Sequence, residues 1–198
     1  MSTKETSADK TKYRLAEAAK KCMASSGTDA MKSASVEKIT VTEIVETCGV
    51  TRQTFYRNFQ DKYDLINWYF DKLLLESFAQ MGDGLTVYEG LTRKFEFIQK
   101  ERVFFAGAFR SDDHNSLREH DYELILDFYT QLIGRKTGRQ PEENILFPLR
   151  LYCRGSIDMT VEWIFAPKER TPEQMAALLV SALPMPVTEL FQQLGVLR

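Results

Sequence analysis

Two helix-start signals lie on either side of a glycine within residues 40–59, and this arrangement most constrains the fold. The sequence TVTE that begins at Thr40 has the form of a capping box, in which Thr40 and Glu43 bond each other's backbone N–H groups. Gly49 tolerates the positive φ at which many helices end, and Thr51 then provides a second N-cap. The segment therefore predicts two short helices joined by a tight turn.

The second of these helices, predicted over 52–59, carries two kinds of side chain on different faces. Phe55 and Phe59 are four residues apart, so they share one face and can pack against the preceding helix. The opposite face is polar and consists of Arg52, Gln53 and Tyr56, with Thr54 at its side. Two short helices joined by a glycine turn and braced by an earlier helix form a helix-turn-helix, whose second helix enters the major groove of DNA.

The residue types on the polar face suit contact with DNA. Arginine forks onto the O6 and N7 atoms of guanine, glutamine pairs with N6 and N7 of adenine, and a threonine methyl group meets the thymine methyl group. Hydroxyl groups and cations near the motif are of the kind that bind phosphates. The predicted DNA-contacting residues are Thr40, Thr42, Thr51, Arg52, Gln53, Thr54, Tyr56, Arg57 and Lys62. The alternative, a solvated polar helix face, does not explain why caps, glycine and phenylalanines fall in register.

Helical periodicity continues through the rest of the chain, without strand-like alternation, and predicts an all-α fold. Asp61 can cap a helix that begins at Lys62 and runs through Phe78. The glycine-rich stretch MGDGLTVYEG at 81–90 is the clearest break. Further helical segments are expected at 10–26, 91–100, 102–110, 117–134, 142–166 and 172–194.

Three local features concern where helices begin, end or bend. Residues 28–38 are small and polar and form either a loop or a short extra turn. Pro148 is expected to kink the helix over 142–166 or to delay its start. Thr171 and Pro172 begin another capping box, with proline at the first helical position.

The stretch ITVTEIVETCGVTRQTFYRNFQDKYDL, at 39–65, resembles the N-terminal signature of the TetR family of transcriptional regulators. The stretch YCRGSIDMTVEWIFAPKERTPEQMAALLV, at 152–180, is similar to the C-terminal region of the dihydroxyacetone-kinase operon activators, a branch of that family. The resemblance implies a helix-turn-helix DNA-binding domain at 1–62, with its core motif at 40–59. A helical domain for effector binding and dimerisation would occupy 63–198.

A homodimer is expected because one recognition helix contacts too few bases for useful specificity. Two recognition helices about 34 Å apart, one DNA turn, would read a near-palindromic operator. The segments 142–166 and 172–194 are the predicted interface, with Trp163, Ile164 and Leu178 or Leu179 as anchors. These residues could alternatively be only intramolecular core.

The resemblance also implies an effector pocket in the C-terminal domain, for an unidentified small molecule, or else a protein co-regulator. Candidate lining residues are Phe105, Phe109, Phe128, Tyr129, Tyr152, Met159 and Trp163. Aromatic residues at helical spacing are more often plain core than ligand contacts. An effector would then shift the population of dimers whose two DNA-binding domains match the operator, in a repressor or in an activator.

Composition excludes several other classes of protein. The net charge of −2 argues against indiscriminate coating of nucleic acid, although residues 1–62 hold 11 Lys and Arg against 8 Asp and Glu. No apolar run reaches the roughly 20 residues of a membrane helix, the N-terminus lacks a signal peptide's apolar stretch, and the three cysteines show no metal spacing. A cytoplasmic protein without membrane contact is expected.

No catalytic arrangement is recognisable, so an enzyme, a metal site and a cofactor are not expected. His114 and His120 are six residues apart and would lie on different faces of a helix. The alternative to a DNA-binding regulator is an all-α ligand-binding or protein-interaction module without DNA binding. The weak basic excess of residues 1–62 and the long link at 28–38 favour that alternative.

Overall fold

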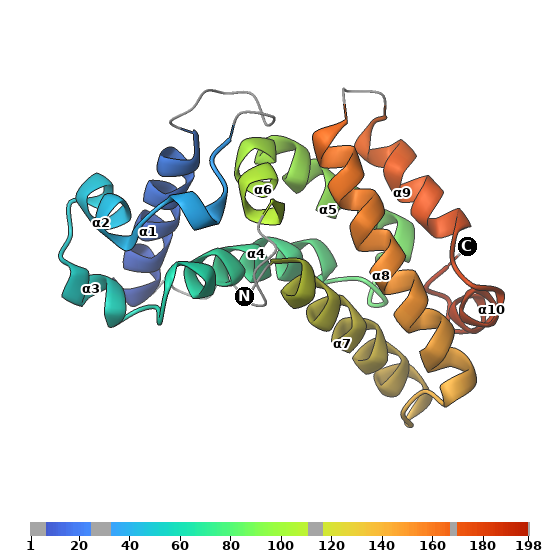
Figure 1. Cartoon of the computed structure of the whole chain (residues 1–198). Helices are drawn as coiled ribbons and strands as arrows, with labels where there is room; N and C mark the ends of the chain where they lie inside the picture. Colours follow the sequence, from blue (N-terminus) through green and yellow to red (C-terminus); the bar gives the residue numbers. More distant parts are fainter. Residues whose placement is uncertain (1–6, 25–32, 111–116, 167–169, 198) are drawn as a thin grey trace. The chain divides into compact units, whose positions relative to one another are not determined.

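The computed structural model describes residues 7–24, 33–110, 117–166 and 170–197 (Figure 1). These residues form ten α-helices and one 3-10 turn without a β-strand, which confirms the all-α prediction. The chain divides into two compact units. The first unit comprises Met1–Lys72 and Glu101–Leu117, and the second comprises Leu73–Lys100 and Arg118–Arg198.

The first unit is built around the predicted helix-turn-helix. Its elements are α1 (Ser7–Ala24), η2 (Val36–Lys38), α2 (Val41–Cys48), α3 (Arg52–Tyr56), α4 (Lys62–Phe78) up to Lys72, and α6 (Arg102–Phe109). Its core is formed by apolar side chains from all the α-helices, among them Leu15, Met23, Ile44, Phe55, Leu65, Phe70 and Phe105, all 2% exposed or less. The boundary between the units lies within α4, and helix α6, which is more distant in the chain, joins the first unit.

Helix α6 is held against α1 and the segment before η2 by close contacts. The Lys20 ammonium lies 2.6 Å from the Glu101 carboxylate, which links α1 to the start of α6. Arg110 donates to the carbonyl oxygen of Ser33 at 2.8 Å. A Cβ atom at Gly107 would lie 2.5 Å from the carbonyl oxygen of Ala34, so only glycine permits this approach. Sequence periodicity could not reveal these contacts, because each joins residues far apart in the chain.

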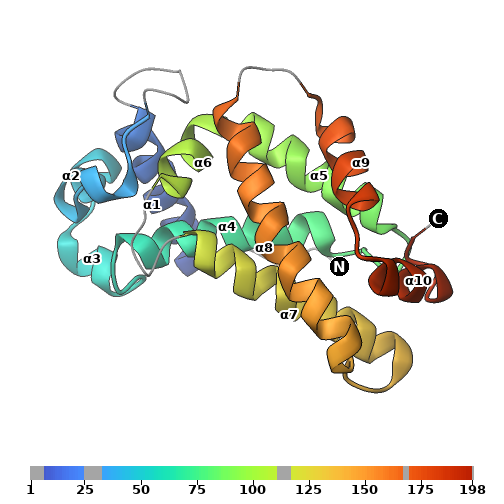
Figure 2. The same ribbon diagram turned by 45° about the vertical axis from the view of Figure 1, so that its right-hand side comes forward.

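The second unit is a bundle of the end of α4, α5 (Val87–Lys100), α7 (Leu117–Thr137) from Arg118 onward, α8 (Glu143–Phe165), α9 (Pro172–Ser181) and α10 (Met185–Gln193). Helices α7 and α8 form an antiparallel pair, α5 packs on α9, and α10 packs on α8 (Figures 1 and 2). Aromatic pairs join these helices in the core: Phe95 with Trp163, Phe78 with Phe128, and Tyr129 with Phe191.

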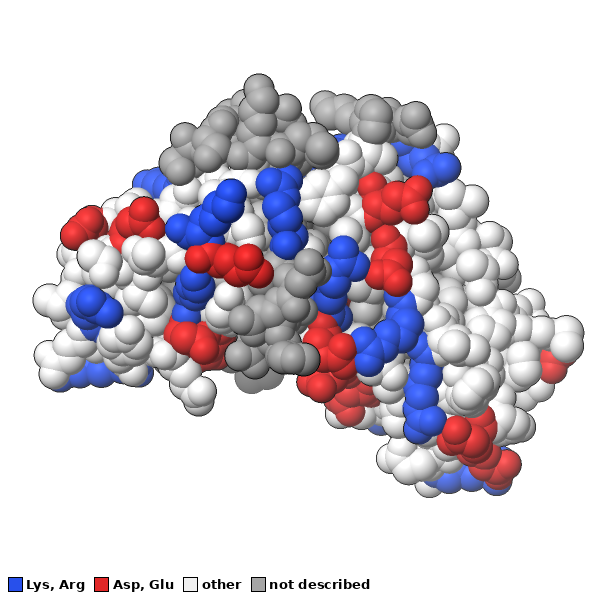
Figure 3. All heavy atoms as spheres, viewed as in Figure 1, with Lys and Arg blue, Asp and Glu red and all other residues white. Residues whose placement is uncertain are grey.

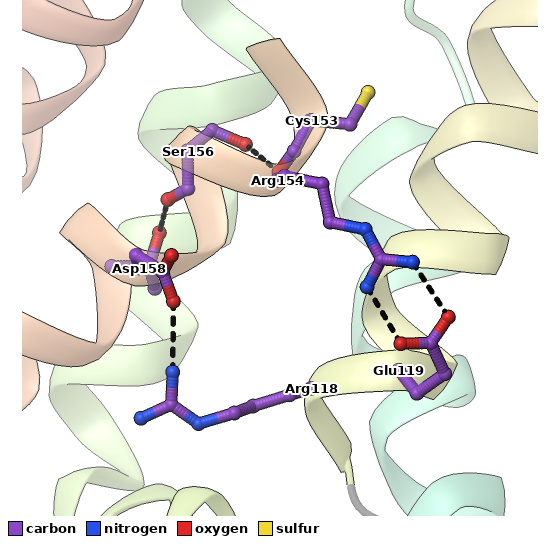
Figure 4. A network of polar contacts seen from close by, with 7 residues as sticks. Arg118, Glu119, Cys153, Arg154, Ser156 and Asp158 are labelled. Atoms are coloured by element: carbon purple, nitrogen blue, oxygen red, sulfur yellow. Dashed lines mark hydrogen bonds and ion pairs between the residues drawn. The ribbon is translucent and has the colours of Figure 1, made fainter. Parts of the chain in front are cut away.

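Ion pairs on the surface connect the start of α7 to the middle of α8 (Figure 4). Arg154 donates to both oxygens of Glu119, at 2.6 and 2.8 Å, and its guanidinium carbon lies 3.4 Å from the centroid of the Tyr122 ring. Arg118 donates to Asp158 at 2.9 Å. As a result, basic and acidic side chains alternate on the face of the second unit that Figure 3 shows.

A further ion pair lies in the interior of the second unit. Lys94 of α5 is 3.4 Å from Asp121 of α7, and the two side chains are 5% and 0% exposed. Removing charges from water is costly, so a buried pair tolerates the loss of one partner poorly.

Helix boundaries differ from the predictions at several places. Helix α3 ends at Tyr56 and not at 59, and Phe59 follows it outside the helix. Helix α5 begins at Val87 and not at 91, because Thr86 and Glu89 form a capping box inside the glycine-rich stretch. The segment 172–194 is two helices, since the residue before Pro184 is disfavoured in helical conformation. The helix predicted at 117–134 extends to Thr137.

Other local features follow the sequence more closely. The described part of 28–38 includes the extra turn η2, whereas 25–32 lie outside the described residues, as does the end of the helix expected at 10–26. Pro148 lies inside α8, which begins at Glu143 and is therefore not delayed. Thr171 and Gln174 form the predicted capping box of α9. No single described helix is long and apolar enough to span a membrane; α9 and α10 pass that test together but are bent by 105°.

Candidate nucleic-acid interface

Helix α2 begins and ends as the sequence predicts. The Thr40 hydroxyl accepts from the Glu43 N–H at 3.2 Å, and the Glu43 carboxylate accepts from the Thr40 N–H at 2.7 Å. The Thr40 hydroxyl also donates to the Glu43 carboxylate at 2.8 Å, and this hydrogen bond, with that from the Thr40 N–H, lowers the pKa of Glu43 below its ordinary value. Gly49 ends the helix in the left-handed conformation, with φ 68° and ψ 38°. The turn thus directs the chain into α3.

Helix α3 is fixed by hydrogen bonds at both ends. The Thr51 hydroxyl accepts from the Thr54 N–H at 3.1 Å, as predicted, and the two threonine hydroxyls are 3.0 Å apart. The Asn58 side chain donates to the Thr54 carbonyl oxygen at 2.7 Å and closes the last turn. Asp61 then accepts from the Asp64 N–H at 2.9 Å, which confirms Asp61 as the cap of α4.

Aromatic packing holds α3 against the rest of the first unit. Phe55 is 0% exposed and Phe59 is 3% exposed, and their ring centroids are 5.9 Å apart. Phe59 also packs against Trp68 of α4 at 5.7 Å, with the Lys12 ammonium 5.3 Å from the centroid of the Phe59 ring. The two phenylalanines therefore anchor α3, as the spacing predicts. Phe59 does so although it lies three residues after the end of the helix at Tyr56.

The outer face of the motif carries the predicted polar residues. Thr40, Thr42, Thr51, Arg52, Gln53, Tyr56 and Arg57 are exposed, whereas Thr54 and Lys62 are half-buried. Within the described residues, the side chains of Arg52, Gln53 and Arg57 form no hydrogen bond or ion pair with the chain, so their donors and acceptors face solvent. Tyr56 is 51% exposed, and its ring forms a T-shaped pair with that of Phe55, with the two ring centroids 5.4 Å apart. The first unit thus presents a rigid helix with a free polar face.

Four of the nine predicted residues are already engaged within the first unit, since the Thr40 and Thr51 hydroxyls form the caps of α2 and α3. The Thr54 hydroxyl is paired with that of Thr51. The Lys62 ammonium donates to the carbonyl oxygens of Glu37 and Ile39, each at 2.9 Å. Sequence reasoning also missed Arg14, which donates to the Cys48 carbonyl oxygen at 3.0 Å across 34 residues. No local sequence signal marks such long-range contacts to backbone.

The seven aromatic and methionine candidates for an effector pocket are divided between the units. Phe105 and Phe109 lie in the first unit and pack with Phe70, whereas the other five lie in the second unit. These five are Phe128, Tyr129, Tyr152, Met159 and Trp163. One hollow of the second unit, of about 180 Å³, lies between the α7–α8 turn and α10 and is lined by none of the seven.

The individual environments of the candidates in the second unit differ. Tyr129 is 1% exposed, and burial raises the pKa of its hydroxyl well above the ordinary value. The Tyr152 hydroxyl donates to the Leu179 carbonyl oxygen at 3.0 Å, and the Trp163 indole donates to that of Arg170 at 3.0 Å. Met159 is 48% exposed. An effector site formed by these residues stays a prediction.

A capped helix-turn-helix with an outward polar face, in an otherwise all-α chain, defines a DNA-binding transcriptional regulator. Family comparison specifies this class further. The model of the bacterial regulatory proteins of the tetR family matches residues 15–68, and a model of a transcriptional regulator C-terminal region matches residues 86–184, half of the chain. The chain therefore belongs to the TetR family of transcriptional regulators.

Individual relatives agree with this assignment. The HTH-type dhaKLM operon transcriptional activator DhaS of Lactococcus lactis subsp. lactis (strain IL1403) is 27% identical over 92 residues, which are 46% of this chain and about half, 49%, of that protein. Among solved structures, a dihydroxyacetone kinase operon activator DhaS matches with a TM-score of 0.56 at 19% identity, covering 95% of this chain and 98% of the other. The transcriptional regulator FadR of Bacillus subtilis, in complex with stearoyl-CoA, matches with a TM-score of 0.55 at 19% identity, covering 89% and 97%.

Proposed function

We propose that this protein is a cytoplasmic homodimeric regulator that reads a near-palindromic operator in double-stranded DNA through α3. One observation carries the proposal: Arg52, Gln53 and Tyr56 are exposed on α3, with Arg57 exposed at its C-terminal end, and buried Phe55 and the Thr51 cap hold this helix in place. Arginine and glutamine supply the forked donors and acceptors that distinguish guanine and adenine in the major groove.

The dimer is supported by apolar residues that the second unit leaves exposed. Phe147, Leu151 and Met159 lie on the exposed side of α8 and are 57%, 61% and 48% exposed. Leu178 of α9 is 50% exposed. Contiguous exposed apolar surface marks interaction sites. On the side drawn in Figure 3, the surface over α9 and α10 carries few charged side chains.

The anchors predicted within this interface behave differently from one another. Trp163, Ile164 and Leu179 are 5%, 0% and 6% exposed and belong to the core of their own unit. Of the four, only Leu178 is half exposed and therefore available to contact a partner. The proposed interface is therefore the exposed stripe of α8 together with Leu178.

We further infer that the second unit receives the regulatory signal, from a small molecule or a protein co-regulator. The neighbouring FadR structure contains stearoyl-CoA, which supports a small-molecule effector in this fold. The signal acts by favouring one of two populations of the dimer, only one of which matches the operator.

A gel-shift experiment with the DNA that flanks the protein's own gene tests the proposed function. We expect a salt-sensitive complex that unlabelled flanking DNA displaces more effectively than unrelated DNA of equal length. Equal displacement by both DNAs at every protein concentration short of aggregation would show that the protein is not a sequence-specific regulator. That result would favour the module without DNA binding.

A further inference from the structure

Lys62, the first residue of α4, binds the protein backbone through its ammonium group. Its ammonium donates to the carbonyl oxygens of Glu37 and Ile39 at 2.9 Å each, 25 and 23 residues earlier in the chain. An ammonium has three N–H donors, so two of them are already used. The side chain is half-buried, unlike the exposed Arg52 and Arg57.

The two carbonyl groups that Lys62 binds lie directly before α2. Ile39, 3% exposed, immediately precedes Thr40, the N-cap of that helix. Lys62 therefore fixes the point at which the chain enters the helix-turn-helix. The same ammonium also contributes to the lowered pKa of Glu43, after the hydrogen bonds from Thr40, and so lies near the capping box.

The other end of α2 is held in the same manner. Arg14 of α1 donates to the carbonyl oxygen of Cys48, the last residue of α2, at 3.0 Å. Carbonyl groups at a helix C-terminus carry partial negative charge and favour a cation. Helix α2 is thus seated between a cation from α1 and a cation from α4.

We propose that Lys62 is a positioning residue, which holds the entry of α2 in register with α3 instead of neutralising a DNA phosphate. Its residue type and place at a helix start fit a phosphate contact equally well, so only its partners in the fold distinguish the two roles. The consequence for DNA rests on the proposed function, whereas the effect on α2 concerns the free protein alone.

Hydrogen exchange of the free protein tests the positioning role without DNA. Lys62→Met removes both hydrogen bonds, and peptides covering 37–44 should exchange at least about threefold faster, because the first turn of α2 opens more often. Lys62→Gln is neutral but keeps an amide donor, so it should restore part of the protection. Lys38→Met is the matched control: Lys38 is exposed in the same segment and its ammonium binds no described residue, so exchange should stay at the wild-type rate.

The salt dependence of DNA binding tests the phosphate alternative. A lysine that neutralises one phosphate contributes about 0.9 to the slope of log K against log salt. For Lys62→Met we expect affinity to fall by about tenfold at every salt concentration, as for a lost charge-assisted hydrogen bond, with the slope changed by less than about 0.3.

The two arms separate the failure of this inference from failure of the proposed function. Unchanged exchange in Lys62→Met, or Lys62→Gln exchanging as fast as Lys62→Met, overturns the positioning role. A slope reduced by about one also overturns it, because Lys62 would then neutralise a phosphate. If the wild-type protein forms no sequence-dependent complex, the proposed function fails, while the exchange experiment still decides the role of Lys62.

Discussion

At the scale of single residues, Gly49 determines whether the chain can turn from α2 into α3. Its φ of 68° is in the left-handed region, which costs a side-chain-bearing residue about 1–2 kcal/mol. A Cβ atom there would have no neighbour within 4 Å, so the cost of Gly49→Ala is conformational and not steric. We expect urea unfolding to show a loss of about 1–2 kcal/mol.

A second glycine provides the control for this prediction. Gly134 lies inside α7, without positive φ, and an added Cβ atom would meet its nearest neighbour at 3.7 Å, an ordinary contact. Gly134→Ala should therefore stabilise the protein by up to about 1 kcal/mol. If both variants changed stability in the same direction, the left-handed turn would not be the cause.

The Tyr56 hydroxyl is the second prediction at this scale. The Tyr56 ring packs against Phe55 in a T-shaped pair, so Tyr56→Phe keeps the packing and removes only the exposed hydroxyl. Binding to all DNA sequences should weaken by a similar factor, because phosphate contacts position the protein without reading bases. Fluorescence anisotropy with the flanking DNA and with unrelated DNA measures both affinities. A selective loss for the flanking DNA would instead give Tyr56 a role in base recognition.

Sequence reasoning was most successful for residues whose partners are close in the chain. The caps at Thr40, Thr51 and Asp61 each bind a backbone group three residues away, so spacing alone predicts them. Lys62 and Arg14 bind carbonyl groups 23 to 34 residues away, and no local pattern specifies those partners.

At the scale of elements, the capping box links the stability of α2 to pH. The pKa of Glu43 is lowered in the folded protein from an ordinary value of 4.5, by hydrogen bonds from Thr40. Its contribution is therefore complete above pH 4.5 and is lost as the pH falls through the lowered folded-state value. Glu43→Gln keeps a capping-box side chain without the titration.

Unfolding measured from pH 3 to 6 tests this sign. Wild type and Glu43→Gln should differ most at pH 5–6, and the difference should shrink as the pH falls below 4.5 and wild-type Glu43 gains its proton. A difference that stayed constant over the whole range would show that the carboxylate charge does not stabilise the cap.

Burial distinguishes the two kinds of ion pair that join the helices of the second unit. Lys94 and Asp121 are buried, so Lys94→Met should destabilise the unit by about 3–5 kcal/mol in urea unfolding. The Arg154–Glu119 pair is about half exposed and screened by solvent, so Arg154→Met should cost about 1 kcal/mol or less. Similar losses in the two variants would contradict this distinction.

Element boundaries were predicted where the start signal was recognised and missed where glycine obscured it. The stretch at 81–90 contains three glycines, yet Thr86 and Glu89 start α5 within it. In the same way, continuous apolar spacing over 172–194 concealed the turn before Pro184. Glycine and proline therefore locate the ends of helices reliably only when the capping residues beside them are considered as well.

At the scale of the whole molecule, the exposed stripe of α8 predicts the oligomeric state. Leu151→Glu places a charge in the proposed interface and should convert the dimer to monomer in sedimentation equilibrium. Leu75→Glu, at a residue of α4 that is 53% exposed, is the matched control and should leave the dimer intact. A Leu151→Glu protein that stayed dimeric would place the interface elsewhere. Of the anchors that the sequence suggested on α8 and α9, Trp163, Ile164 and Leu179 are buried in their own unit, because periodicity does not separate the inner from the outer apolar face.

The central claim is that the outer face of α3 recognises DNA sequence. Its most direct test is the specificity ratio of DNA binding. This ratio is the dissociation constant for unrelated DNA divided by that for the flanking DNA, measured for wild type and Gln53→Ala at one salt concentration. A lost two-point base contact costs about 1–3 kcal/mol, so we predict that the ratio falls by about 5- to 150-fold, while the affinity for unrelated DNA changes little. An unchanged ratio in Gln53→Ala, and equally in Arg52→Ala, would contradict the claim.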